Sequence, residues 1–167
     1  MNNEPHTDRG RKAVSLLKSL LHNTGAVIVG FGFALLGAGL DCILGLTAFH
    51  SIFIQTLAGL LLTIGFLLRV WATYHFYEHH MRVISIVPQN ALITTGPYRI
   101  TRNPLYIGGI VFIFLGAVLL LGSPSGILLT ALNVVLVDFI IRREEKQLER
   151  EFGEEWVRYR NQVRRWL

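Results

Sequence analysis

Four long apolar stretches decide what this chain can fold into. They cover residues 24–46, 52–76, 105–122 and 125–141. A helix needs roughly 20 apolar residues to cross the hydrocarbon core of a bilayer. Composition excludes an ordinary soluble domain, because 51% of the 167 residues are hydrophobic and only 16% are charged, whereas soluble domains average about a quarter charged residues. We predict an all-α integral-membrane bundle of four transmembrane helices, in which a tight turn at 122–126 makes the last two a hairpin.

The positive charges lie on one side of this predicted bundle. None of the 16 Lys and Arg residues falls in the two short turns, 47–51 and 122–126. By the positive-inside rule, both termini and the linker 77–104 face the cytoplasm. We predict one membrane domain over 1–167, which consists of an amphipathic surface segment at 1–23, the four-span bundle at 24–141 and an amphipathic cytoplasmic helix at 142–167.

The linker ends in turn, basic and aromatic residues just before the third apolar stretch. Asn103 and Pro104 predict a helix start, with Asn103 as N-cap and Pro104 in the first helical position. The free backbone N–H groups of that start, flanked by Arg99 and Arg102, suit a bound anion. Gly108, one turn later, leaves room for a ligand or for another backbone. In the alternative interpretation, the arginines are membrane-surface anchors and Gly108 is a packing residue.

A pair of acidic residues follows the fourth apolar stretch. Glu144 and Glu145 lie in the first turn after it, and a hairpin places them at the level of the helix start at Asn103. The carboxylates would then face a cationic helix end. In the alternative, both glutamates pair in solvent with basic neighbours on their own helix, and such pairs stabilise little.

The C-terminal residues carry an amphipathic pattern. One apolar stripe on an otherwise charged helix consists of Leu148, Phe152, Trp156, Tyr159 and Val163. Such a helix lies on the membrane surface or folds over the cytoplasmic mouth of the bundle. Gly153 interrupts it and allows a bend.

Two segments of the sequence resemble a known family. They are GPYRITRNPLYIGG at 96–109 and EEKQLEREFGEEWVRYRNQVRRW at 144–166. Together they resemble the isoprenylcysteine carboxyl methyltransferase family and its phospholipid methyltransferase relatives, which share RHPxYxG, a later Glu-Glu pair and an aromatic amphipathic tail. The resemblance covers roughly residues 90–167 and implies binding of S-adenosylmethionine between the last spans, under the C-terminal helix. The residues expected to bind this cofactor are Tyr98, Asn103, Pro104, Tyr106, Gly108, Glu144 and Glu145, and those expected to be catalytic are Arg99 and Arg102.

Asn103 departs from the family pattern, which has histidine at this position in its isoprenylcysteine members. An amide does not titrate, so no general base is expected there. A carboxylate acceptor needs none, because it attacks the methyl group directly, whereas an amine must first lose a proton. We therefore expect methyl transfer to a lipophilic acceptor at the cytoplasmic membrane face, with isoprenylcysteine carboxylate-like O-methylation favoured. The alternatives are phospholipid amine N-methylation and a non-catalytic lipid-binding membrane protein.

Other polar residues carry weaker signals. His75–His79 contains H-x-x-E-H, an inverted zinc-protease pattern, but a single histidine cluster does not predict a metal site. The basic tail is interleaved with glutamates, which favours anionic lipid head groups over nucleic acid. Inside or near spans, Asp41, Arg69 and Asp138 each require a partner or a wet cavity. Asp138 is near enough to Glu144 to share its site, and Arg69 can snorkel to the surface. No oligomeric state is indicated.

Overall fold

The computed structural model describes residues 5–78 and 92–167, and this part of the chain is helical apart from short connections. The elements are α1 (Pro5–Leu44), α2 (Ile52–Glu78), the 3-10 turn η1 (Gly96–Arg99), α3 (Pro104–Tyr106), the π-helix η2 (Ile107–Phe114), α4 (Leu115–Leu121), α5 (Pro124–Phe152) and α6 (Glu154–Gln162). Because α3, η2 and α4 are contiguous, they form one helical span. Within the described residues, four helical segments are long and apolar enough to cross a membrane: Lys12–Leu44, Ile52–Tyr77, Pro104–Leu121 and Pro124–Phe152. The predicted all-α, four-span fold is confirmed.

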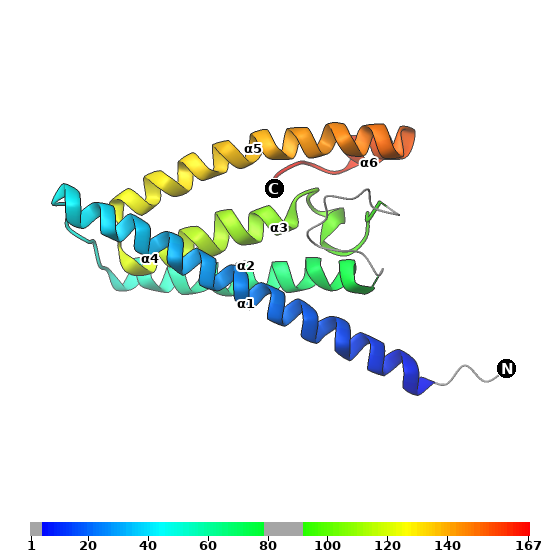
Figure 1. Cartoon of the computed structure of the whole chain (residues 1–167), viewed down its shortest axis with the longest axis horizontal. Helices are drawn as coiled ribbons and strands as arrows, with labels where there is room; N and C mark the ends of the chain where they lie inside the picture. Colours follow the sequence, from blue (N-terminus) through cyan, green and yellow to red (C-terminus); the bar gives the residue numbers. More distant parts are fainter. Residues whose placement is uncertain (1–4, 79–91) are drawn as a thin grey trace.

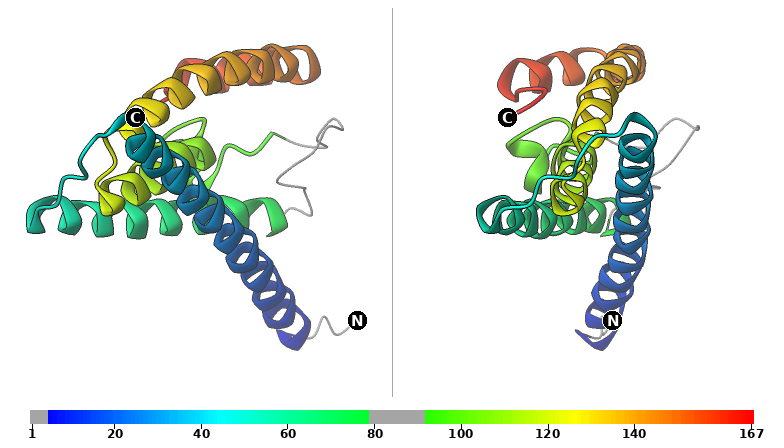
Figure 2. Two further views of the ribbon diagram at one scale, coloured as in Figure 1. Left: turned by 60° about the vertical axis from the view of Figure 1, so that its left-hand side comes forward. Right: turned by 90° about the vertical axis from the view of Figure 1, so that its left-hand side faces the viewer.

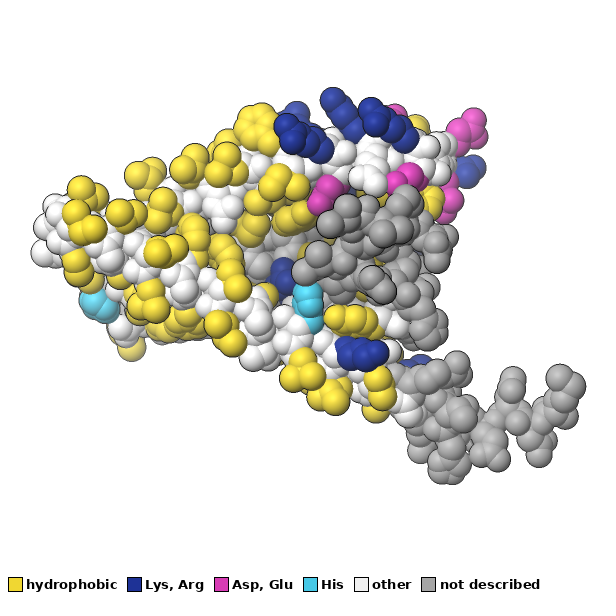
Figure 3. All heavy atoms as spheres, viewed as in Figure 1, with side chains coloured by type: hydrophobic (Ala, Val, Ile, Leu, Met, Phe, Trp, Pro, Cys, Tyr) yellow, Lys and Arg dark blue, Asp and Glu magenta, His cyan; other side chains and the backbone are white. Residues whose placement is uncertain are grey.

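The four spans form a bundle that splays at one end (Figure 1). The span made of α3, η2 and α4 lies between α2 and α5, and α1 crosses α2 obliquely. Two further views show the same arrangement (Figure 2). The turns after α1 and α4 lie at one end, and η1 and α6 lie at the other. Apolar side chains cover most of the visible surface of the spans, whereas charged side chains gather at the η1 end (Figure 3). The chain is a multi-pass membrane protein.

α1 begins well before the first apolar stretch and runs through it without a break. In its described residues, the amphipathic segment predicted at 1–23 therefore belongs to the same helix as the first span. The Ser19 hydroxyl donates to the Val70 carbonyl (2.8 Å), and the Asn23 amide donates to Thr73 Oγ1 (2.7 Å). Ser19 and Asn23 are fully buried. Such interhelical hydrogen bonds hold helices together in lipid, which explains why this part of α1 packs along α2.

The third span contains a π-helix where the apolar pattern predicts an ordinary α-helix. This π-helix packs closely against α2, because a Cβ on Gly65 would lie 2.6 Å from the Gly108 carbonyl oxygen. Its hydrogen bonds close wider turns than those of an α-helix, and such stretches are frequent at functional sites. The apolar composition of a span is the same in both helix types, so sequence reasoning did not distinguish them.

The turn between the last two spans is joined to α1 by hydrogen bonds. Gly122 ends α4 in the left-handed region at φ 65°, and the Ser123 side chain caps α5 by accepting from the Gly126 N–H (3.0 Å). Asp41, buried on α1, accepts hydrogen bonds from the Ser123 hydroxyl and from the Ser125 N–H. These donors are the partners that a carboxylate near a membrane span requires.

Gly37 lets α1 and α5 touch at the backbone. A Cβ there would lie 2.5 Å from the Gly126 Cα, whereas Gly39 has nothing within 4 Å. Gly37→Val is expected to lower the thermal unfolding midpoint in detergent, because overpacking costs about 1–3 kcal/mol. Gly39→Val is the matched control and leaves the midpoint near that of the wild type. Equal midpoints for the two variants would contradict this contact.

Candidate functional site

The predicted helix start and acidic pair lie together in the structure. Pro104 is the first residue of α3, and Asn103 precedes it as the N-cap residue. The Tyr106 hydroxyl donates to Glu144 Oε1 (2.8 Å), and Arg102 Nη1 lies 3.2 Å from Glu145 Oε1. Glu144 therefore contacts the first turn of the third span, Glu145 contacts the segment just before it, and neither pairs with a basic neighbour on its own helix.

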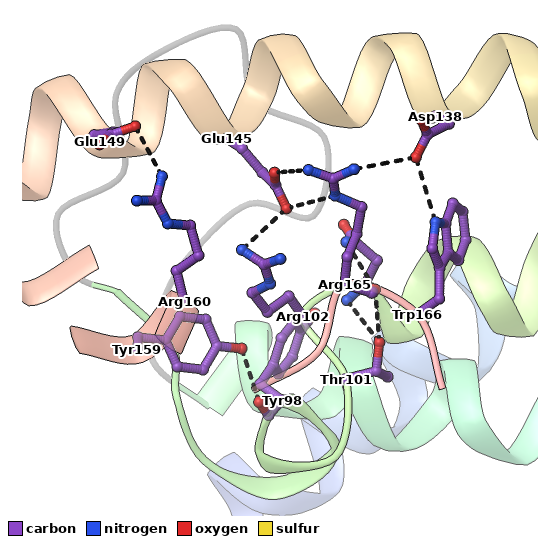
Figure 4. Close-up of polar contacts among 11 residues, drawn as sticks. Tyr98, Thr101, Arg102, Asp138, Glu145, Glu149, Tyr159, Arg160, Arg165 and Trp166 are labelled. Carbon is purple, nitrogen blue, oxygen red and sulfur yellow. Dashed lines mark hydrogen bonds and ion pairs between the residues drawn. The ribbon is translucent and has the colours of Figure 1, made fainter. Parts of the chain in front are cut away.

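Glu145 is the centre of a charged cluster (Figure 4). Its side chain is 11% exposed, and that of Arg102 is 9% exposed. Arg165 donates to both carboxylate oxygens, from Nε (3.0 Å) and from Nη2 (2.6 Å). Asp138 accepts from Arg165 Nη1 (3.5 Å) and from the Trp166 indole (3.3 Å). The hydrogen bonds to Glu145 raise the pKa of Arg165, so its guanidinium stays charged.

Residues 163–167, here named the C-terminal strap, bring Arg165 to this cluster. Val163 ends α6 in an extended conformation. A backbone bridge joins Thr101 to Arg164. The Thr101 hydroxyl (2.9 Å) and the Asn103 side-chain amide (3.1 Å) both donate to the Arg165 carbonyl. The Asn103 side chain therefore binds the strap and makes no capping hydrogen bond to α3, which corrects the predicted side-chain cap.

α6 folds over this end of the bundle. Gly153 separates it from α5 at φ 52°, as the predicted bend requires. Trp156 is 2% exposed and Tyr159 is 7% exposed, and both pack in one apolar cluster with Ala72 of α2. The Tyr159 hydroxyl also donates to the Tyr98 carbonyl (2.7 Å). Of the two predicted positions for the C-terminal helix, the structure shows the one over the mouth of the bundle.

Buried donors at this site lack a hydrogen-bond partner in the described part of the chain. They are Arg102 Nε, Arg102 Nη1 and Trp156 Nε1. Arg102 Nη1 forms an ion pair with Glu145 but lacks the geometry of a hydrogen bond. The Arg102 guanidinium carbon lies 5.6 Å from the centre of the Trp156 ring. A buried donor without an acceptor is costly, so these groups suit an anionic ligand, while the nearby carboxylates suit a cationic one.

Comparison with protein families identifies the chain. A family model described as phospholipid methyltransferase matches residues 53–155. The chain belongs to the phospholipid methyltransferase family. The match includes the helix start and both glutamates, and it confirms the resemblance found in the sequence. Membership in this family implies a membrane methyltransferase that acts on lipid-like substrates. Comparisons with curated proteins and with solved structures gave no match.

The other residues predicted for this methyltransferase site lie in different surroundings. Tyr98 is buried, burial raises the pKa of its phenol, and the hydroxyl has no hydrogen-bond partner among the described residues. Gly108 is buried against α2, where a Cβ would lie 2.7 Å from Arg69 Cγ. Arg99 is exposed and forms no hydrogen bond or ion pair with the described residues. The structure therefore brings Arg102 to the acidic cluster but not Arg99.

Sequence reasoning did not assign Arg165, Trp166 or Thr101 to the site. The first two form a basic–aromatic pair inside the segment that resembles the family. However, eight Lys and Arg residues follow Ile141, and no spacing rule singles out Arg165 among them. Asp138 was expected as a neighbour of Glu144, and its contacts with the C-terminal strap place it there.

The H-x-x-E-H pattern falls partly outside the described residues, because His79 is among those the structure does not describe. His75 Nδ1 lies 2.9 Å from the Trp71 carbonyl oxygen. Among the described residues, no group of three or more His, Cys, Asp or Glu side chains is placed to hold a metal ion.

Arg165→Ala is expected to release the C-terminal strap, because Glu145 and Asp138 lose the guanidinium that they share. Breaking a buried ion pair costs about 3–5 kcal/mol, and we expect about 2 kcal/mol here because the Arg165 side chain is 26% exposed. Thermal unfolding and carboxypeptidase digestion of the purified protein measure both effects. Arg164→Ala is the control, since the exposed side chain of Arg164 has no part in the cluster. Wild-type digestion of the Arg165 variant would contradict the anchoring role.

Proposed function

We propose that the chain transfers a methyl group from S-adenosylmethionine to a lipophilic acceptor that enters from the bilayer. The supporting observation is that acidic side chains and unpaired buried donors lie together at the end of the bundle that carries η1 and α6, in a chain of this family. The methionine part of S-adenosylmethionine requires both, because it carries a carboxylate, an ammonium and a sulfonium. When bound, this cofactor supplies an electrophilic methyl group.

The residues at the site have complementary roles in this proposal. Glu144 and Glu145 hold the cationic groups of the cofactor. Arg102 and the Trp156 indole donate to its carboxylate, next to the helix start at Pro104. Asn103 and Tyr106, which contact the C-terminal strap and Glu144, are further predicted cofactor contacts, and Arg102 is the predicted catalytic residue at this site. Tyr98, Gly108 and Arg99 lie in other surroundings and take no part in holding the cofactor in this proposal. α6 and the C-terminal strap exclude water, which favours attack by the acceptor over side reactions.

O-methylation of an isoprenylcysteine-like carboxylate is the reaction we favour. A carboxylate attacks the methyl group without losing a proton, and Asn103 offers no titrating group where relatives carry a histidine. The apolar chain of such an acceptor is soluble in the bilayer in which the four spans lie.

The family description favours a second reaction, N-methylation of a phospholipid amine. The two reactions are separated by incubating membranes that contain the protein with cofactor carrying a radiolabelled methyl group. Label in protein or prenylcysteine that base releases as volatile methanol indicates a methyl ester and therefore a carboxylate acceptor. Stable label in a phospholipid head group indicates an amine. Label in neither fraction would contradict both reactions.

Cofactor binding is tested separately from turnover. Calorimetry of the detergent-purified chain with S-adenosylhomocysteine is expected to show a dissociation constant in the micromolar range. No heat at millimolar ligand would instead support a non-catalytic lipid-binding protein with this fold.

The proposal requires the site to face the cytoplasm, as the distribution of Lys and Arg predicts. Two single-cysteine variants test this in a Cys42→Ser background, one with Ser51→Cys in the turn after α1 and one with Arg143→Cys on α5. A membrane-impermeant maleimide added to intact cells is expected to label position 51 and not position 143. The reverse labelling pattern would contradict the orientation.

A further inference from the structure

Arg69 is a positive charge inside α2 that has no carboxylate partner among the described residues. Its Nε donates to Asn23 Oδ1 (2.9 Å), and its Nη1 donates to the Leu105 carbonyl (2.7 Å). The side chain therefore points into the bundle and does not snorkel to the surface. A guanidinium has five N–H donors, and these two contacts leave three of them without a described partner.

The contacts around Arg69 fix the position of its guanidinium. The guanidinium lies against glycines of the third span, since a Cβ on Gly109 would lie 2.7 Å from Arg69 Nη1. This contact falls in the π-helix. On the other side, Asn23 is oriented by its hydrogen bonds to Thr73 Oγ1 and the Ser19 carbonyl. An intramembrane charge that is held so firmly, without an opposite charge, indicates a functional group.

A second unpartnered donor lies close to Arg69. The Tyr98 hydroxyl is buried and has no hydrogen-bond partner in the described part of the chain, and the residue is 7% exposed. Tyr98 packs in one apolar cluster with Ala72 of α2, which lies three residues, about one helical turn, after Arg69. An unpartnered hydroxyl and a guanidinium with donors to spare therefore both lie beside the same part of α2.

This place adjoins the proposed methyl-transfer site. Leu105 accepts from Arg69, and the next residue, Tyr106, donates to Glu144. The face shown in Figure 3 is hollowed between α1 and α5, and a basic and a histidine side chain line the hollow.

We propose that Arg69 and the Tyr98 hydroxyl bind the acidic group, a phosphate or a carboxylate, of the lipophilic acceptor. Arg69 lies within a candidate span, nine residues before the end of α2, so a lipid dissolved in the bilayer can bring an acidic group to it at a smaller desolvation cost than a water-soluble anion. The inference rests on the proposed function for the identity of the ligand as acceptor. It makes Arg69 a substrate-binding residue that selects acceptors bearing a negative charge close to the methylated atom.

The test compares charged and neutral amphiphiles of matched chain length on the purified full-length chain. The phosphate pair is dioctanoyl phosphatidic acid and dioctanoylglycerol, and the carboxylate pair is S-farnesylthioacetic acid and its methyl ester. Dissociation constants are measured by thermophoresis. Because only the charged member of each pair gains charge-assisted hydrogen bonds from Arg69, the wild type is expected to prefer at least one charged member by about tenfold or more. The pair that shows the larger preference identifies phosphate or carboxylate as the ligand.

Arg69→Gln is expected to abolish this preference, and Arg69→Lys to retain part of it. Tyr98→Phe is expected to weaken it. Arg158→Gln removes an equal charge from the exposed face of α6 and is expected to keep it. S-adenosylhomocysteine binding and the unfolding midpoint are measured for each variant. Equal affinity of the wild type for both members of both pairs would overturn the inference.

Two further outcomes separate this inference from the alternatives. Loss of the preference in Arg69→Gln together with loss of S-adenosylhomocysteine binding and a lower midpoint would show that Arg69 is only structural, and would overturn the inference. A wild type that prefers charged amphiphiles but does not bind S-adenosylhomocysteine would contradict the proposed function and leave the anion site in place.

Discussion

Glu145→Gln is expected to lower the affinity for S-adenosylhomocysteine by about a hundredfold, as loss of a buried, charge-assisted contact worth about 2–3 kcal/mol implies. The substitution keeps the shape of the side chain and removes the only carboxylate that Arg102 contacts in the described part of the chain. Arg102 and Arg165 then face each other without an intervening negative charge. Calorimetry on the detergent-purified variant measures the affinity.

The control is Glu149→Gln, one turn further along α5. Glu149 makes an exposed ion pair with Arg160, with side chains 44% and 39% exposed, and such pairs contribute little. The Glu149→Gln variant is expected to bind S-adenosylhomocysteine with the affinity of the wild type. Glu144→Gln tests the second acid, which accepts from Tyr106, and is also expected to weaken binding. Wild-type affinity of both the Glu144 and the Glu145 variants for S-adenosylhomocysteine would refute the assignment of the acidic pair to the cofactor.

Trp156→Ala is expected to detach α6 and the C-terminal strap from the bundle. The residue is 2% exposed, and it packs with Tyr98, Ile93 and Ala72 in the apolar cluster that holds α6. Truncating a fully buried Trp costs about 3–5 kcal/mol, and here the loss falls on a short helix with few other buried side chains. Hydrogen exchange of residues 154–167 is expected to become much faster, and binding of S-adenosylhomocysteine to weaken because water enters the site.

Trp71→Ala provides the matched control, because the same atoms are removed from a side chain that is 44% exposed on α2. Exchange at 154–167 should then remain as slow as in the wild type. If Trp156→Ala also left exchange slow, packing of Trp156 would not be what holds the cap in place.

Local pattern was enough to predict several features of the chain. Apolar length predicted four spans, and the structure has four candidate spans in its described residues. Pro104 starts α3, and Gly153 separates α5 from α6, at the positions that their backbone preferences predict. The hairpin between the last two spans predicted that Glu144 and Glu145 lie near the helix start. These features depend on residues close together in the sequence, or on one short turn, so the sequence carries them directly.

Only the tertiary structure decided which charges pair. Glu145 pairs with Arg102 and Arg165, Arg69 donates to Asn23 and Leu105, and Asn103 binds the strap instead of capping its own helix. Each contact joins segments 20 or more residues apart, so it depends on how the helices cross and where the strap turns back. Charge attraction has little directional preference, and a carboxylate can pair with any arginine that packing brings within reach. The amino-acid sequence therefore determined the helices and the chemical groups available, whereas the crossing of those helices determined which groups share one site.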